Sequence, residues 1–207
     1  MTVMPMFPLG SVLLPGGVLP LHVFEPRYRA LVEACVASED HEFGVVLIQR
    51  GHEVGGGDER RGVGTVARMV QVAEMPDGRY AVVSVGTHRV RVNAWLPDDP
   101  YPVADVDDWP DDDPDDPAVG PLVAELAPRV RRAAALALEL GDPVGDPQID
   151  LSDDPLVASY HLVALAPFSV VDQFDLLCAP GPLARLTMLR ERLDDVEALL
   201  QFRLDDA

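Results

Sequence analysis

The chain of 207 residues contains no lysine, since all sixteen of its basic residues are arginine. A P-loop needs a lysine on the β- and γ-phosphates of a nucleotide. A Ser-Lys dyad needs a lysine that loses its proton near neutral pH, which arginine does not do. Schiff-base and pyridoxal chemistry depend on the same amine. The composition therefore excludes these classes of catalytic site.

Positive charge is also scarce, because the sixteen arginines face thirty-five acidic residues and the formal net charge is −19. Nucleic-acid binding and docking on anionic membranes both draw on clustered basic residues. We therefore expect no nucleic-acid partner and no membrane partner. Proteins, peptides and small molecules remain as partner classes.

Cysteine is nearly absent, and Cys35 and Cys178 lie far apart in the sequence. Two such residues in a cytoplasmic protein are expected to be reduced, buried thiols. The N-terminal segment lacks the basic start and unbroken apolar stretch of a secretory signal, which favours a cytoplasmic location. The five histidines show no metal-ligand spacing. We expect neither a metal nor a cofactor.

The segment 98–116 holds ten aspartates and four prolines, which is typical of a solvated linker or a long loop. Calcium binding is the alternative for so many carboxylates. However, the segment lacks the central glycine and final glutamate of an EF-hand loop.

The first hundred residues favour β-structure, because short β-branched and apolar runs alternate with turn-forming residues. A glycine-rich, charged loop is expected over 51–62. One amphipathic helix is predicted to start at Pro26 and to run through Val36. The strands are expected at residues 3–7, 19–24, 43–50, 63–75, 80–85 and 88–96.

Beyond Pro117 the composition becomes helical. Helices are expected over 118–140, with Pro128 as a boundary or kink, and over 155–165, where Asp154 is the N-cap. Two more are expected over 169–177 and from 182 onward. The predicted fold class is α+β, with a β-rich part at 1–110, an acidic linker at 111–117 and a helical part at 118–207.

Three segments resemble the N-terminal substrate-binding domain of Lon proteases. The first is FPLGSVLLPGGVLPL at 7–21, which continues as HVFEPRY at 22–28, a form found in stand-alone members. The second is GVGTVAR at 62–68. The third combines PDG at 76–78 with VGTHRV at 85–90. The motifs occur in the family's order, the helical C-terminal half also suits the family, and the resemblance covers nearly the whole chain.

This resemblance implies a PUA-like β pseudo-barrel followed by a C-terminal helical bundle. In full-length Lon this region helps to recognise substrates and to assemble the hexamer, and the ATPase and Ser-Lys peptidase lie further along. From the chain length and the missing lysine we expect neither of those two activities here. We therefore expect a binding module and not an enzyme.

The apolar opening of the chain is the predicted binding surface, because an exposed apolar patch there would hold an unfolded peptide. The alternative is that these side chains all pack into the sheet. For Glu25 and Arg27 the structural alternative is that Glu25 caps the following helix while Arg27 pairs with a carboxylate. The candidate peptide-binding residues are Leu13, Leu14, Val18, Leu19, Leu21, Phe24, Glu25, Arg27 and Tyr28.

The leading hypothesis is a peptide- or protein-binding adaptor or a holdase. Its expected partners are an unfolded client and a separate protease, and a homo-oligomer is also open. The alternative is a small-molecule sensor, since cereblon joins a Lon-like domain to a ligand-binding domain. RNA binding, which other PUA-like folds perform, is opposed by the charge. Ser84 and His88 suggest a nucleophile and a base, but neither lies in a nucleophile elbow.

Overall fold

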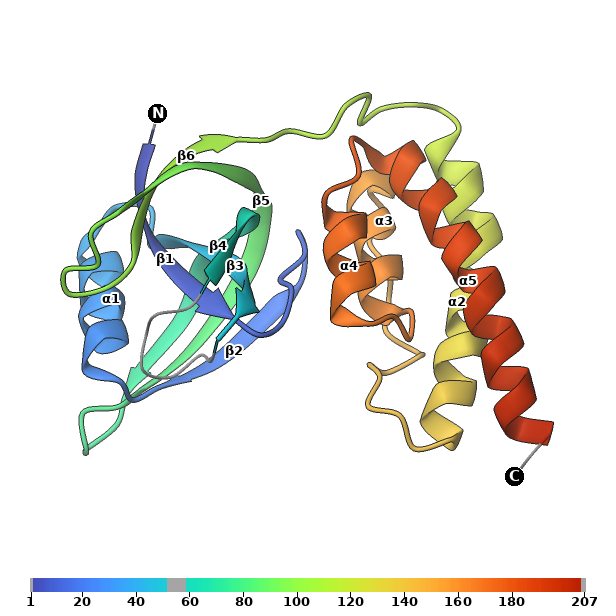
Figure 1. Ribbon diagram of the computed structural model, residues 1–207, viewed down its shortest axis with the longest axis horizontal. Coiled ribbons are helices and arrows are strands. Elements are labelled where there is room, and N and C mark those ends of the chain that lie inside the picture. The colour runs from blue at the N-terminus through green and yellow to red at the C-terminus, as the bar shows by residue number, and fades with distance from the viewer. Residues whose placement is uncertain (1, 52–58, 206–207) are drawn as a thin grey trace. The chain divides into compact units, whose positions relative to one another are not determined.

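The computed structural model describes residues 2–51 and 59–205. The chain divides into two compact units, Met1–Pro110 and Asp111–Ala207 (Figure 1). Among the described residues, the first unit contains six strands and one helix, and the second contains four helices. No described helix has both the length and the apolar character that are needed to cross a membrane.

The six described strands form one sheet, in which β2 has a single neighbour. The order is β2-β5-β4-β3-β1-β6, and only β1 and β3 are parallel. β6 also pairs with the second half of β5, so that it lies against both β1 and β5. β2 pairs with the first half of β5 alone. The strands are β1 (Thr2–Leu9), β2 (Val18–Val23), β3 (Glu42–Arg50), β4 (Glu59–Glu74), β5 (Tyr80–Leu96) and β6 (Val103–Asp108).

Alternate side chains of the strands enter two separate hydrophobic clusters. On β1, Phe7 and Leu9 belong to one cluster and Met6 belongs to the other. On β3, Val45 belongs to the first cluster and Val46 to the second. Because successive residues of a strand point to opposite faces, the two clusters lie on opposite faces of the sheet.

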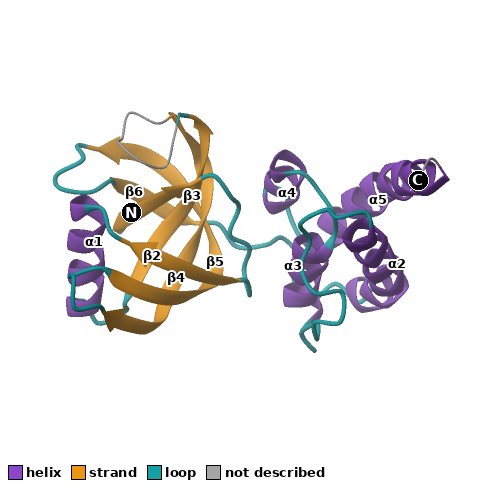
Figure 2. Ribbon diagram, turned by 90° about the horizontal axis from the view of Figure 1, so that it is seen from below, coloured by secondary structure: helices purple, strands orange, loops and turns teal. Residues whose placement is uncertain are grey.

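The helix α1 (Pro26–Ala37) covers the cluster that contains Phe7 (Figure 2). Pro26 stands at the start of the helix, where its missing N–H costs nothing. The Tyr28 ring stacks on the Phe7 ring with 4.1 Å between their centroids. Burying each such side chain contributes roughly 1.5–3 kcal/mol. The buried face of the helix consists of Tyr28, Leu31, Val32 and Cys35.

The connection between β1 and β2 is hydrogen-bonded to β4 and β5. The Thr65 hydroxyl donates to the Leu13 carbonyl at 2.6 Å. The Gly86 N–H donates to the Gly17 carbonyl at 2.9 Å. A Cβ at Gly86 would overlap the carbonyl oxygen of Leu14. Parts of all three Lon-like motifs therefore meet at this connection.

In the second unit, α2 packs against α3 and α5, which lie beside it in both views (Figures 1 and 2). The predicted N-caps are confirmed: the Asp154 carboxylate accepts from the Leu156 N–H, and the Ser169 hydroxyl accepts from the Asp172 N–H. The helices are α2 (Val119–Glu139), α3 (Pro155–Leu165), α4 (Val170–Leu177) and α5 (Pro182–Asp205).

A fully buried arginine joins three helices of the second unit. The Arg185 guanidinium donates to the Ser159 hydroxyl at 2.8 Å and to the Leu176 carbonyl at 3.2 Å, and it forms an ion pair with Asp111. It also lies over the Tyr160 ring, whose hydroxyl donates to the same aspartate at 2.7 Å. These partners compensate a charge that would otherwise be costly to bury.

The expectation of a linker or loop over 98–116 is wrong for its central part, because Val103–Asp108 forms β6. Ala104 and Val106 are buried while Asp105 and Asp107 alternate with them. This is the period of a strand, and the many aspartates obscured it. At 111–117, where a linker is expected, Asp111 holds the buried ion pair with Arg185.

For other elements the boundaries expected from the sequence differ from those in the structure. The strands expected at 80–85 and 88–96 are one strand, β5, which bends through its register shifts against β4. Pro128 lies inside α2 and is not a helix boundary. Of the expected loop over 51–62, residues 52–58 lie outside the described residues, whereas 59–62 belong to β4.

We predict that Gly86→Ala lowers the free energy of unfolding by about 1–3 kcal/mol, because the new methyl group overlaps a backbone oxygen that cannot move aside easily. Gly62→Ala is the matched control, since a Cβ there meets no atom within 4 Å. Urea denaturation followed by circular dichroism measures both. Equal stability of the two variants would contradict the close packing of the β1–β2 connection against Gly86.

We predict that Arg185→Met destabilises the second unit by about 3–5 kcal/mol, because it removes the fully buried guanidinium that donates to Asp111, Ser159 and Leu176. Arg203→Met is the control, since its ion pair with Asp142 is more than one third exposed on both sides. That change should leave the denaturation midpoint almost unaltered. A mild effect of Arg185→Met would show that the buried pair matters little.

Candidate functional site

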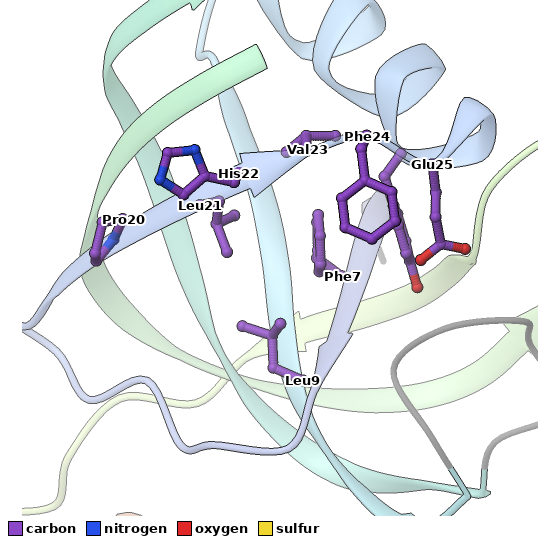
Figure 3. A pocket seen from close by; sticks show the side chains of 9 residues that line it. Phe7, Leu9, Pro20, Leu21, His22, Val23, Phe24 and Glu25 are labelled. Carbon is purple, nitrogen blue, oxygen red and sulfur yellow. The ribbon is translucent and has the colours of Figure 1, made fainter. Parts of the chain in front are cut away.

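A mainly apolar cleft lies between β1, β2 and the start of α1 (Figure 3). Its volume is about 200 Å³. Phe7, Leu9 and Leu21 point into the space between the two strands, and the Glu25 carboxylate lies at one end. The cleft, as the term is used below, is lined by Phe7, Leu9, Pro20, Leu21, His22, Val23, Phe24, Glu25 and Tyr28.

The strand pairing explains why the cleft is there. β6 pairs with β1 only over Thr2–Pro5. Beyond that point the same edge of β1 faces β2, which is paired with β5 instead. In the described part of the chain no ladder joins β1 to β2. The sheet is therefore open along this edge, and side chains line the opening.

The floor of the cleft is made of buried aromatic rings, and few polar groups line it. The Phe7 and Tyr28 rings are both buried, and they stack on each other. In contrast, 56% of Phe24 is exposed at the rim. His22 and Glu25 are the ionisable groups among the lining residues apart from Tyr28. Such a surface suits an apolar group that enters from solvent.

Glu25 does not cap α1, and the expectation that its side chain accepts backbone N–H groups is wrong. Its carboxylate instead accepts from the Arg27 Nε–H at 3.1 Å. The expected pairing of Arg27 with a carboxylate is thus confirmed, and the partner is Glu25 itself. The Arg27 guanidinium also lies 4.4 Å from the centroid of the Tyr28 ring. A charged pair therefore borders one end of the cleft.

The structure brings together only part of the predicted binding surface. Leu21, Phe24, Glu25 and Tyr28 line the cleft. The other five candidates do not line it: Leu13 and Leu14 are buried, Val18 is 66% exposed, and Leu19 and Arg27 are half-buried. For Leu13 and Leu14 the alternative of packing in the core is the one that the structure shows.

Sequence reasoning missed five of the lining residues, which are Phe7, Leu9, Pro20, His22 and Val23. A signal for them exists in the repeated pattern of a proline between two apolar residues. The pattern occurs as FPL at 7–9 and as LPL at 19–21. It cannot show that the two segments face each other, because that depends on which strand β2 pairs with.

The suspected nucleophile and base are not a catalytic pair. Ser84 is fully buried. The His88 ring contacts Thr87 through Nδ1 at 3.0 Å and Asp108 through Nε2 at 3.1 Å. The Thr87 hydroxyl donates to the Val66 carbonyl. Asp108 is largely exposed. This exposed chain of contacts does not connect His88 to Ser84.

Metal and thiol chemistry find little support in the described residues. No group of three or more His, Cys, Asp or Glu side chains within them could hold a metal ion. Both cysteines are free thiols. Cys35 is buried under α1 and its Sγ donates to the Glu42 carbonyl at 3.3 Å. Burial raises the pKa of the Cys35 thiol to about 12, so it stays protonated at neutral pH.

The sequence profile of the ATP-dependent protease La (LON) substrate-binding domain matches residues 3–195. Lon protease 2 of Myxococcus xanthus is 39% identical over 107 residues, which are 51% of this chain and 13% of that protein. The Lon protease of Anaeromyxobacter dehalogenans is 39% identical over 101 residues, 48% of this chain and 12% of that protein. The chain thus matches about an eighth of the length of these relatives.

Solved structures agree with the profile. A Lon N-terminal domain protein from Xanthomonas campestris superimposes with a TM-score of 0.67 at 30% identity, over 92% of this chain and 98% of that one. The N-terminal domain of a Mycobacterium avium complex Lon protease has a TM-score of 0.63 at 20% identity, over 94% and 99% of the two chains. The second likeness bears on the fold alone.

We predict that Cys35 does not react with a thiol reagent in the native protein at pH 8. With a pKa of about 12, about one molecule in 10⁴ carries the reactive thiolate. The Cys178→Ala variant isolates this thiol, and labelling is compared before and after unfolding in urea. Native labelling as fast as that of the unfolded chain would show that Cys35 is accessible.

Proposed function

Because this chain belongs to the family of the ATP-dependent protease La (LON) substrate-binding domain, we propose that it is a non-catalytic module that binds unfolded polypeptide in the cleft. The observation that carries the proposal is an apolar cleft with an exposed aromatic rim on the unit that bears the Lon-like motifs. Among the predicted binding residues, Leu21, Phe24, Glu25 and Tyr28 form the contact surface.

The size and lining of the cleft favour a peptide over a small molecule. Pockets for small molecules commonly measure about 300–1,000 Å³ and enclose most of the ligand. The cleft has about 200 Å³ and opens along a strand edge. It accepts one large apolar side chain of a longer chain more readily than a whole ligand. The small-molecule sensor is therefore the weaker candidate.

We propose that the fold around the cleft is a PUA-like pseudo-barrel over 1–110, followed by a helical bundle over 118–207. The pairing of β6 with both β1 and β5 supports the first part, and the packing of α2 on α3 and α5 supports the second. The charge of −19 opposes the RNA binding found in other PUA-like proteins. An adaptor that delivers clients to a separate protease, or a holdase, fits this surface.

The test is binding of a reduced, permanently unfolded protein, measured by fluorescence anisotropy. We expect Phe24→Ser to weaken binding about tenfold, because loss of one buried aromatic contact is worth about 1.4 kcal/mol or more. Phe24 is mostly exposed, so the variant should fold as the unmodified protein does.

Phe202→Ser is the matched control, since Phe202 on α5 is also a largely exposed phenylalanine, at 64% against 56% for Phe24. It should bind the unfolded protein as tightly as the unmodified chain. The proposal fails if the unmodified chain does not bind, or if both substitutions weaken binding equally. Retained binding in Phe24→Ser would place the site elsewhere on the molecule.

A further inference from the structure

Every second residue of β2 directs its backbone groups toward the cleft. The Gly86 N–H donates to the Gly17 carbonyl, and β2 continues from that pair in antiparallel register with β5. Hydrogen-bonded and non-bonded pairs alternate along an antiparallel ladder. The odd-numbered residues of β2 therefore bond to β5. Pro20 and His22 present their backbone groups to the open edge.

The same reasoning applies to β1. The Met6 N–H donates to the Pro102 carbonyl at 2.8 Å, and Met4 pairs with Ala104 in the same register. The even-numbered residues of β1 therefore direct their backbone groups toward β6. The strand β1 continues past the first residue of β6, and its next even-numbered residue is Pro8, whose backbone groups point to the same edge of β1.

Each strand edge that borders the cleft thus carries a proline, Pro8 on β1 and Pro20 on β2. Proline has no N–H, so it cannot donate to a neighbouring strand. Natural sheets use proline in this way to prevent a free edge from recruiting another strand. The two prolines explain why β1 and β2 do not join, and they also oppose the addition of a peptide as an extra strand.

The backbone groups that remain at the cleft are mostly acceptors. The carbonyls of Pro20 and His22 face it, whereas His22 supplies the one N–H of these two residues. The Glu25 carboxylate at the end of the cleft is already paired with the Arg27 guanidinium, so the free acceptors of the rim are mainly backbone carbonyls. The chain as a whole carries a net charge of −19. An occupant that brings hydrogen-bond donors and positive charge complements this rim.

We propose that the cleft binds a polypeptide segment in which a large apolar side chain is flanked by arginine or lysine, and that it holds the segment by side chains and not by strand addition. This inference rests on the proposed function, and it adds which segments of a client are selected. The apolar side chain enters between Phe7, Leu9 and Leu21. The flanking cation donates to the carbonyls at the rim.

The test compares two short labelled peptides that differ only in the residues flanking a central phenylalanine, two arginines in one and two glutamates in the other. Anisotropy titrations at low and moderate salt should show the arginine peptide binding at least about tenfold more tightly. The preference should shrink as salt screens the charges. Equal affinities, or tighter binding of the glutamate peptide, would overturn the proposal.

A second peptide pair tests the mode of binding. Methylation of alternate backbone nitrogens in the arginine peptide removes the donors that a β-ladder needs and leaves its side chains intact. We expect the methylated peptide to keep its affinity within about threefold, since side chains hold it. A loss of tenfold or more would show that the peptide is added as a strand, despite the two prolines.

The Phe24→Ser and Phe202→Ser variants locate the binding of the arginine peptide. Only Phe24→Ser should weaken it, and an equal effect of both would contradict binding in the cleft. If unfolded proteins bind in the cleft but neither peptide does, this inference fails and the proposed function stands. If the unfolded proteins do not bind either, both fail together.

Discussion

The hydrogen bonds that hold the segment between β1 and β2 against β4 and β5 determine the strand arrangement of the first unit. Hydrogen bonds from Thr65 to Leu13 and from Gly86 to Gly17 bring this segment onto β4 and β5. From there β2 continues along β5 and not along β1. The free edges of β1 and β2 then face each other across a cleft, and Pro8 and Pro20 lack the N–H groups that would close it. The glycines at 16, 17 and 86 allow the close approach that this arrangement requires.

All sixteen basic residues of the chain are arginine, and some of these arginines take structural roles that lysine would fill less well. Arg185 spreads its donors over a carbonyl, a hydroxyl and a carboxylate in the interior of the second unit. Arg89, also buried, lies over the Trp109 ring and donates to the Pro110 carbonyl. A planar guanidinium can satisfy several acceptors and stack on a ring at once, whereas an ammonium is a compact and strongly hydrated charge. The acidic residues, by contrast, are largely exposed.

Apolar lining and an acceptor-rich rim give the cleft a defined chemical character. The stacked rings of Phe7 and Tyr28 form its floor, and in the proposed complex the exposed Phe24 loses contact with water. Apolar contact tolerates many sequences, which suits the recognition of unfolded chains. The proposed preference for a flanking cation would add a selection by charge that apolar contact alone does not provide. Membership of a substrate-binding family and this surface chemistry both support the proposal of a polypeptide partner.

The sequence by itself determined the family, the α+β class and most of the elements, because turns, caps and periodicity are local signals. Asp154 and Ser169, for example, cap their helices as their positions predict. Local signals failed for β6, whose aspartates resemble a loop until β1 and β5 pair with it. Only the tertiary structure decided which apolar residues are buried and which line the cleft. Leu13 and Leu21 look alike in sequence, and strand pairing, which joins distant residues, buries the first and leaves the second at an open edge.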